Sequence, residues 1–171
     1  MKKITLIFCV GLLFADYGGG YAGSSFRYGS NAREIGLSNT LVSNYNKGYN
    51  ALTNPALLGT KLSKLEYGLS YFSMSLDRSI QTFSISIPAP PSASIGLSLF
   101  MTSVDDIQGT DDNGSYTSLY KAWEGFGKLS FGLELEKISA GVNVKVLKNE
   151  IDTHNGSGVG LDIGFLYKLS S

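Results

Sequence analysis

The chain has 171 residues and a balanced formal charge, with 14 Lys or Arg against 14 Asp or Glu. This length indicates one domain, and the charge balance gives no bulk attraction for nucleic acid. Only 16% of the residues are charged, whereas Gly, Tyr and Phe are frequent. That composition is unusual for a cytosolic domain and is typical of β-structure, both in outer-membrane barrels and in some secreted proteins.

The N-terminus has the three parts of a secretory signal peptide. Lys2 and Lys3 precede an apolar run over residues 4–14, and the small residue Ala15 follows. The run is shorter than the roughly 20 residues that span a bilayer. We predict a signal peptide over residues 1–15, with cleavage after Ala15 as the first choice and the Ala22–Gly23 region as the second. The alternative is a buried strand that begins the chain.

The only cysteine, Cys9, lies inside this apolar run. Phe8 before it is too bulky for a lipoprotein processing site, so no lipid anchor is predicted. Cleavage would leave a mature chain without cysteine, which excludes disulfides, thiolate metal sites and a cysteine nucleophile.

Residues 16–23 are rich in Gly and Tyr and are predicted to be a leader. Residues 24–60 lack the alternation of a strand. They are predicted to form short helical turns and loops, with one short strand among them at most. Asn54 and Pro55 mark a turn or helix start, because proline fits the first helical position and the asparagine before it can cap the helix.

Residues 61–171 contain six runs in which apolar residues alternate with small or polar ones, the pattern of strands with one apolar face. The predicted strands are Glu66–Ser75, Ser79–Ile87, Ala93–Met101, a fourth that contains Leu129 and starts near Lys121, a fifth that contains Val142 and a sixth that contains Leu161. In the first strand, either Tyr67, Leu69 and Tyr71 or Phe72 and Met74 point outward. The alternation fits strands that cross an outer membrane at a tilt, and it also fits a soluble sheet.

From the second connection on, the connections between these strands alternate in length. Short turns are predicted at Leu76–Arg78, at Pro88–Pro91 and at Lys137, and polar loops over Thr102–Ser118 and Glu150–Ser157. Pro88 ends the second strand, because proline donates no hydrogen bond to a sheet. Outer-membrane barrels have long outer loops and short periplasmic turns. The alternation therefore favours a barrel over a sandwich.

Several polar residues are candidates for chemistry, but no catalytic, metal-binding or cofactor-binding residue is predicted. His154 is the only histidine, and no nearby nucleophile supports general base catalysis, so an exposed loop histidine is expected. An acidic group does not have the spacing of a calcium-binding loop, which favours a solvated surface loop. Its members are Asp105, Asp106, Asp111, Asp112 and Asn113.

A glycine-rich stretch, Gly156–Gly160, leads into a strand, whereas phosphate-binding loops lead into a helix. We interpret its glycines as small residues facing a barrel lumen. Glu134 and Asp162 are expected on the same face, where they line a polar interior or form a carboxylate pair. Aromatic residues near strand ends either anchor a barrel at the membrane interfaces or pack within an ordinary sheet. They are Trp123, Tyr67, Tyr71 and Tyr167.

Three stretches resemble proteins of the PorV/PorQ type, a branch of the FadL-like outer-membrane barrels. They are Tyr28–Asn39, Asn54–Leu58 and Gly160–Tyr167. Family members typically read Gly-x-x-Ala-Arg-x-x-Gly-Met-Gly and then Asn-Pro-Ala-Gly-Leu. This chain departs from both motifs, since residues 37–39 (LSN) replace the end of the first and Leu57 replaces the glycine of the second.

The resemblance implies an all-β fold: an antiparallel meander of an outer-membrane β-barrel over residues 61–171, preceded by a plug-like segment over residues 24–60. It implies location in the outer membrane of a Gram-negative-type bacterium. The implied roles are a component of protein export, resembling type IX secretion, or a channel for hydrophobic small molecules. The implied partners are outer-membrane lipid, secretion-system proteins or exported cargo, and a hydrophobic small molecule, with no cofactor and no nucleic acid.

Six strands are too few to close a barrel, since single-chain bacterial barrels start at eight. An incomplete barrel is therefore expected, either a fragment of a longer protein or a short form that assembles. The alternative is a soluble secreted β-sandwich that acts as an adhesin or binding module. An enzyme is not predicted.

Overall fold

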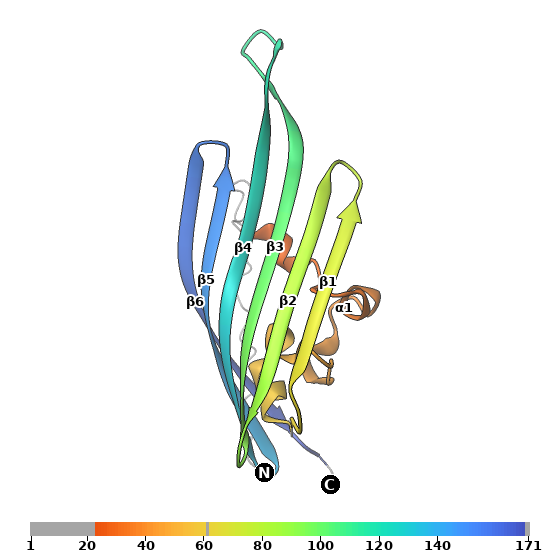
Figure 1. The fold of residues 1–171 in the computed structure, drawn as a ribbon, viewed down its shortest axis with the longest axis vertical. Helices are drawn as coiled ribbons and strands as arrows, with labels where there is room; N and C mark the ends of the chain where they lie inside the picture. The colour runs from red at the N-terminus through yellow and green to blue at the C-terminus, as the bar shows by residue number, and fades with distance from the viewer. Residues whose placement is uncertain (1–22, 61, 170–171) are drawn as a thin grey trace, which may run out of the picture.

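The structure, a computed structural model, describes residues 23–60 and 62–169. The predicted signal peptide and the leader up to residue 22 lie outside the described residues. The described residues form six strands, and Figure 1 shows the short helical turns on one side of them. The strands are β1 (Glu66–Met74), β2 (Arg78–Ala89), β3 (Ala93–Thr110), β4 (Tyr116–Leu135), β5 (Ile138–Ile151) and β6 (His154–Tyr167).

The six strands form one sheet in the order β1-β2-β3-β4-β5-β6, and every pair is antiparallel. This meander confirms the predicted all-β class and the positions of all six strands. Among the described residues the sheet is open, with β1 and β6 at its two edges.

The two predicted polar loops are wrong. β3 continues to Thr110 and β4 begins at Tyr116, so Thr102–Ser118 is mostly a long hairpin that rises above the rest of the sheet (Figure 1). Likewise β5 reaches Ile151 and β6 begins at His154, inside the predicted loop Glu150–Ser157. Beyond Val104, β3 pairs only with β4, so the hairpin there is a two-stranded ribbon. It has no face to bury, and its mostly polar sequence therefore lacks the apolar alternation that predicts a strand.

The proline turn begins two residues later than predicted. β2 includes Pro88, which pairs with Ser94 of β3, and ends at Ala89. The last β2 residue paired with β1 is Ser86. Pro88 thus lies where β2 has a neighbour on one side only, a position that tolerates a missing N–H.

The N-terminal segment (residues 23–60) forms helical turns, as predicted, and its described residues contain no strand. The turns are η1 (Ser24–Arg27), α1 (Ala32–Gly36), η2 (Leu41–Ser43), α2 (Asn50–Thr53) and η3 (Pro55–Gly59). The predicted helix start is confirmed, because the Asn54 side chain accepts a hydrogen bond from the Ala56 amide at 3.0 Å and Pro55 is the first residue of η3.

A buried carboxylate holds this segment together. Glu34 is 7% exposed. Its side chain accepts hydrogen bonds from the Ser30 amide at 2.6 Å and from the Thr53 hydroxyl at 3.1 Å. Since these donors lie on both sides of α1 in the chain, Glu34 ties the start of the segment to α2.

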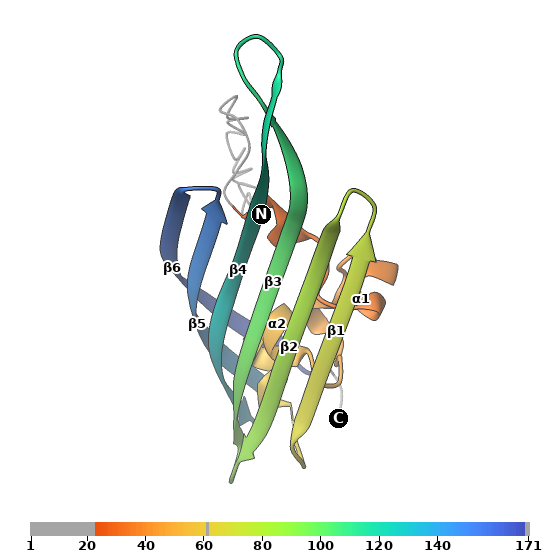
Figure 2. The same ribbon diagram turned by 45° about the horizontal axis from the view of Figure 1, so that its top comes forward.

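The N-terminal segment packs on one face of the sheet, as Figure 2 shows for its helical turns. Serines and glycines of the sheet lie beneath it. Leu57 and Leu58 of η3 are almost fully buried there, and each such side chain contributes about 1.5–3 kcal/mol. Their approach depends on glycines of the sheet. A Cβ on Gly132 would lie 2.6 Å from the Gly59 nitrogen, and one on Gly141 would collide with the backbone of Pro55.

Substitution of Gly141 by alanine tests this close approach. We expect Gly141→Ala to lower the free energy of unfolding by about 1–3 kcal/mol, because the added methyl displaces Pro55. Gly158→Ala is the matched control, since Gly158 also lies in a strand and a Cβ added there would meet nothing within 4 Å. The measurement is a denaturant titration followed by the fluorescence of Trp123, the single tryptophan. Equal losses of unfolding free energy in the two variants would contradict the close packing of Pro55 on Gly141.

Candidate functional site

The opposite face of the sheet carries large apolar side chains that are exposed. The register brings them into rows across all six strands, one of which runs Tyr67, Ile85, Leu97, Leu129, Val144 and Leu161. We call this surface the apolar belt. Its exposed members include Tyr67, Leu69, Tyr71, Phe83, Ile87, Ile95, Leu97, Leu99, Met101, Leu129, Phe131, Ile138, Val144, Val146, Val159, Leu161, Ile163, Phe165 and Tyr167.

The belt also shows which side chains of β1 lie on the exposed apolar face. Tyr67, Leu69 and Tyr71 are 74%, 77% and 66% exposed. Phe72 and Met74 have the other parity and are only partly exposed. The first of the two alternatives for this strand is therefore correct.

On the side of the long hairpin the belt ends in a mixed row, in which Tyr71 and Met101 share a row with Gln81, Gly125, Lys148 and Ser157. The row beyond it contains Ser73, Ser79, Ser103, Trp123, Glu150 and Asn155, and is polar except for the tryptophan. On β5 the belt runs from Ile138 to Val146, a length of about 26 Å at the usual strand rise. Trp123 and Tyr167 lie at opposite borders, whereas Tyr67 lies within the belt.

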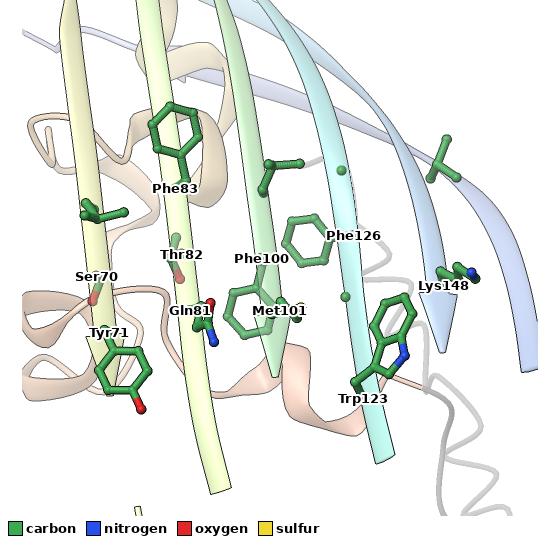
Figure 3. Close-up of a pocket in the computed structure, with 15 residues that line it drawn as sticks. Ser70, Tyr71, Gln81, Thr82, Phe83, Phe100, Met101, Trp123, Phe126 and Lys148 are labelled. Atoms are coloured by element: carbon green, nitrogen blue, oxygen red, sulfur yellow. The ribbon is translucent and has the colours of Figure 1, made fainter. Parts of the chain in front are cut away.

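A groove of about 550 Å³ crosses the sheet at this border. Gly125 and Gly127 leave space between Met101 of β3 and Lys148 of β5. The ammonium of Lys148 lies 5.3 Å from the centre of the Trp123 ring. Figure 3 shows these side chains together with the rings of Tyr71 and Phe83. The groove thus joins an apolar floor to one cationic group.

The face under the N-terminal segment carries a cluster of charged groups. Lys128 is 5% exposed. Its ammonium donates to the Leu52 carbonyl at 3.1 Å and lies 3.7 Å from Asp162. Lys145 forms a closer ion pair with Asp162 at 2.7 Å. The amide of Asn143 is 3.4 Å from both Asp162 and the Ala51 carbonyl.

These groups border a cavity of about 500 Å³ between the N-terminal segment and β4–β6. Leu52, Phe126 and Leu147 supply apolar walls, and Lys128 and Lys145 supply positive charge. Sequence reasoning placed Asp162 and Lys145 on this face, but it assigned no role to Lys145 and did not identify Lys128. The alternation could have located Lys128 as well, because Lys128 precedes the outward-facing Leu129, just as Lys145 follows the outward-facing Val144. In the structure the two lysines are direct partners in the register of β4 and β5.

The other predicted carboxylate, Glu134, forms an ion pair with Lys168. Glu134 and Asp162 are thus each paired with lysine. A second anchor of the N-terminal segment lies at Glu66, which accepts hydrogen bonds from the Gly48 amide at 3.0 Å and from the Tyr45 hydroxyl. Burial, and then this contact with Glu66, raise the pKa of the Tyr45 hydroxyl above its usual range.

The acidic group of the long hairpin is spread over its length. Asp105 forms an exposed ion pair with Lys121 at 3.1 Å. Asp111 accepts hydrogen bonds from the Asn113 and Ser115 amides at 2.9 and 2.8 Å, and so shapes the turn. Within residues 23–60 and 62–169, no three His, Cys, Asp or Glu side chains gather closely enough to hold a metal ion.

His154 and the glycine-rich stretch belong to the start of β6. His154 is exposed, and its ring nitrogen Nδ1 lies 3.3 Å from the Thr153 hydroxyl. Gly160 has a packing role, because a Cβ there would meet the side chain of Lys145. The glycine therefore leaves room for Lys145 to lie across β6 and reach Asp162.

Removal of the Asp162 charge tests the cluster. We expect Asp162→Asn to lower the free energy of unfolding by about 2–3 kcal/mol, because the buried ammonium of Lys128 loses its counter-charge. Adding Lys128→Met should restore part of the loss. Asp105→Asn removes the exposed pair with Lys121 and should cost less than about 1 kcal/mol. The same denaturant titration measures all three, and equal effects of the two aspartate variants would refute a buried pair.

No helix in the described part of the chain is both long and apolar enough to span a membrane. Comparisons of the chain with protein-family models, with curated proteins and with solved structures give no match.

Proposed function

We propose that this chain forms part of the wall of an outer-membrane β-barrel of the PorV/PorQ type, in a Gram-negative-type bacterium. The apolar belt carries the proposal. In a soluble sheet, the face with the large apolar residues packs against a second layer. Here the N-terminal segment covers the other face, where serines such as Ser84 and Ser98 are fully buried.

The dimensions of the belt support contact with lipid. Outer-membrane barrels carry an apolar band about 25 Å tall, bordered by aromatic residues, on strands tilted by about 35–45°. The belt is about 26 Å long along β5, and Trp123 and Tyr167 lie at its two borders. Its height at such a tilt is about 20 Å, close to the thickness of a thin outer membrane.

The proposal assigns residues 61–171 to the barrel wall and residues 24–60 to a plug in the lumen. The contacts of Lys128, Asn143 and Glu66 with the N-terminal segment support this division, because all three side chains lie on the face away from the belt. A lipid-exposed sheet edge is not tolerated. Further strands must therefore pair with β1 and β6, from a longer chain or from neighbouring subunits.

Within this proposal, the cavity beside Lys128 favours a channel for hydrophobic small molecules. Its volume of about 500 Å³ is in the range of small-molecule sites, which combine apolar walls with a few polar groups. A role in protein export, with secretion-system proteins or cargo as partners, is the second candidate. It rests on the motifs over residues 28–39 and 54–58.

Cell fractionation tests the location. We expect the expressed protein in the outer-membrane fraction, extractable by detergent, and faster on a gel when it is not heated, because a closed barrel stays compact. Recovery as a soluble protein from the periplasm or the medium would refute the membrane proposal. A secreted β-sandwich, acting as an adhesin or binding module, would then be the better explanation.

A charge placed in the middle of the belt tests contact with lipid. We expect Ile163→Arg to lower stability in the membrane by about 2–4 kcal/mol, the cost of arginine near the bilayer centre. Asn155→Arg is the matched control on the same strand and the same face, beyond the polar border, and should cost about 0–1 kcal/mol. Unfolding from lipid vesicles by denaturant measures both. Equal costs would refute the depth assigned to Ile163.

A further inference from the structure

The carboxylate of Glu124, in the half of β4 nearer the long hairpin, binds the first described residues of the chain. The Gly23 nitrogen donates to Oε2 of Glu124 at 3.1 Å. The Ser25 nitrogen donates to Oε1 at 3.2 Å, and the Ser25 hydroxyl donates to the same oxygen. A single side chain, 101 residues away in sequence, therefore accepts three hydrogen bonds from residues 23–25.

Phe26, the next residue along the chain, holds the same stretch against β3 and β4. Its ring meets Phe100 and Phe126 edge-on, with ring centres 5.8 and 5.0 Å apart. Phe100 and Phe126 are themselves stacked at 5.3 Å. Figure 2 shows η1 behind β3 and β4. Gly23 thus lies at a fixed place against Glu124.

The charge of Glu124 has no basic partner in the described part of the chain. Of the four ion pairs there, none involves Glu124. The amide and hydroxyl donors of residues 23–25 leave the negative charge of this partly buried carboxylate without an opposite charge. A cationic donor at the same distance adds an ion pair to the hydrogen bond. The nitrogen of Gly23 becomes such a donor if the peptide bond before it is hydrolysed.

The sequence before Gly23 fits that hydrolysis. Signal peptidases cleave after a small residue that is preceded, two positions earlier, by another small residue. Gly20 and Ala22 satisfy this pattern. At the alternative site, Ala15 is preceded two positions earlier by the larger Leu13.

We propose that a secretory signal peptidase cleaves the Ala22–Gly23 bond and that Glu124 binds the new α-ammonium group of Gly23. Water adds across the peptide bond, so that Ala22 leaves with a carboxylate and Gly23 keeps the nitrogen as an ammonium. Of the two cleavage sites that the sequence leaves open, this selects the second. The proposal requires export of the chain but does not require a barrel.

N-terminal sequencing and the intact mass of the exported protein test the cleavage site. The full chain is produced in a secreting Gram-negative host and purified from whichever fraction contains it. We expect an N-terminus at Gly23. An N-terminus at Asp16, or a chain that retains residues 1–22, would overturn the proposal. The cell fraction in which the protein is found tests the barrel proposal alone. The cleavage proposal and the barrel proposal can therefore fail separately.

A thermodynamic cycle tests the role of Glu124. It compares the chain that begins at Gly23 with one that begins at Asp16, each with and without Glu124→Gln. We expect the substitution to change the unfolding equilibrium constant roughly tenfold more in the Gly23 form, because only there does it remove an ion pair. Glu150→Gln is the control and should act equally in both forms. An equal effect of Glu124→Gln in the two forms would overturn binding of the ammonium group.

Discussion

The close approach of two backbones governs this structure. At Gly59 and Gly132, and again at Pro55 and Gly141, the N-terminal segment and the sheet touch without any side chain between them. Leu57 and Leu58 are buried only because these contacts exist. The same proximity lets side chains of the sheet reach backbone groups of the segment, as Lys128 reaches the carbonyl of Leu52.

This constraint reverses the usual distribution of residues in a sheet. Small residues occupy the covered face, where Ser84, Ser98 and Ser130 are at most 1% exposed. Large apolar residues occupy the uncovered face. Bulky residues in place of the serines and glycines under the segment would lift it from the sheet, so the covered face requires small side chains. Under the membrane proposal, the uncovered face supplies the apolar surface for lipid. The arrangement suits a wall between a hydrocarbon phase and a filled interior.

Local patterns in the sequence predicted what depends on neighbours in the chain. The alternation located all six strands, and Asn54 with Pro55 located the start of η3. The last part of β3 and the first part of β4 were missed. They form a two-stranded ribbon of mostly polar residues, which buries neither face and leaves no periodic pattern of apolar residues in the sequence. The contacts of Lys128 and Glu124 were missed for another reason: they depend on the strand register and on the path of a segment that is distant in sequence.

The order of the strands has a consequence for how the chain folds. Each strand pairs with the one just before it, so every step of sheet formation closes a short loop at low entropic cost. The N-terminal segment is different, since its contacts with Lys128, Asn143 and Glu124 span 76, 92 and 101 residues. Its partners on β4 and β5 do not exist until those strands have been synthesised and paired. The parts of the segment that contact β4 and β5 are therefore the last to reach their place, whereas its anchor at Glu66 of β1 spans only 18 and 21 residues and can form early.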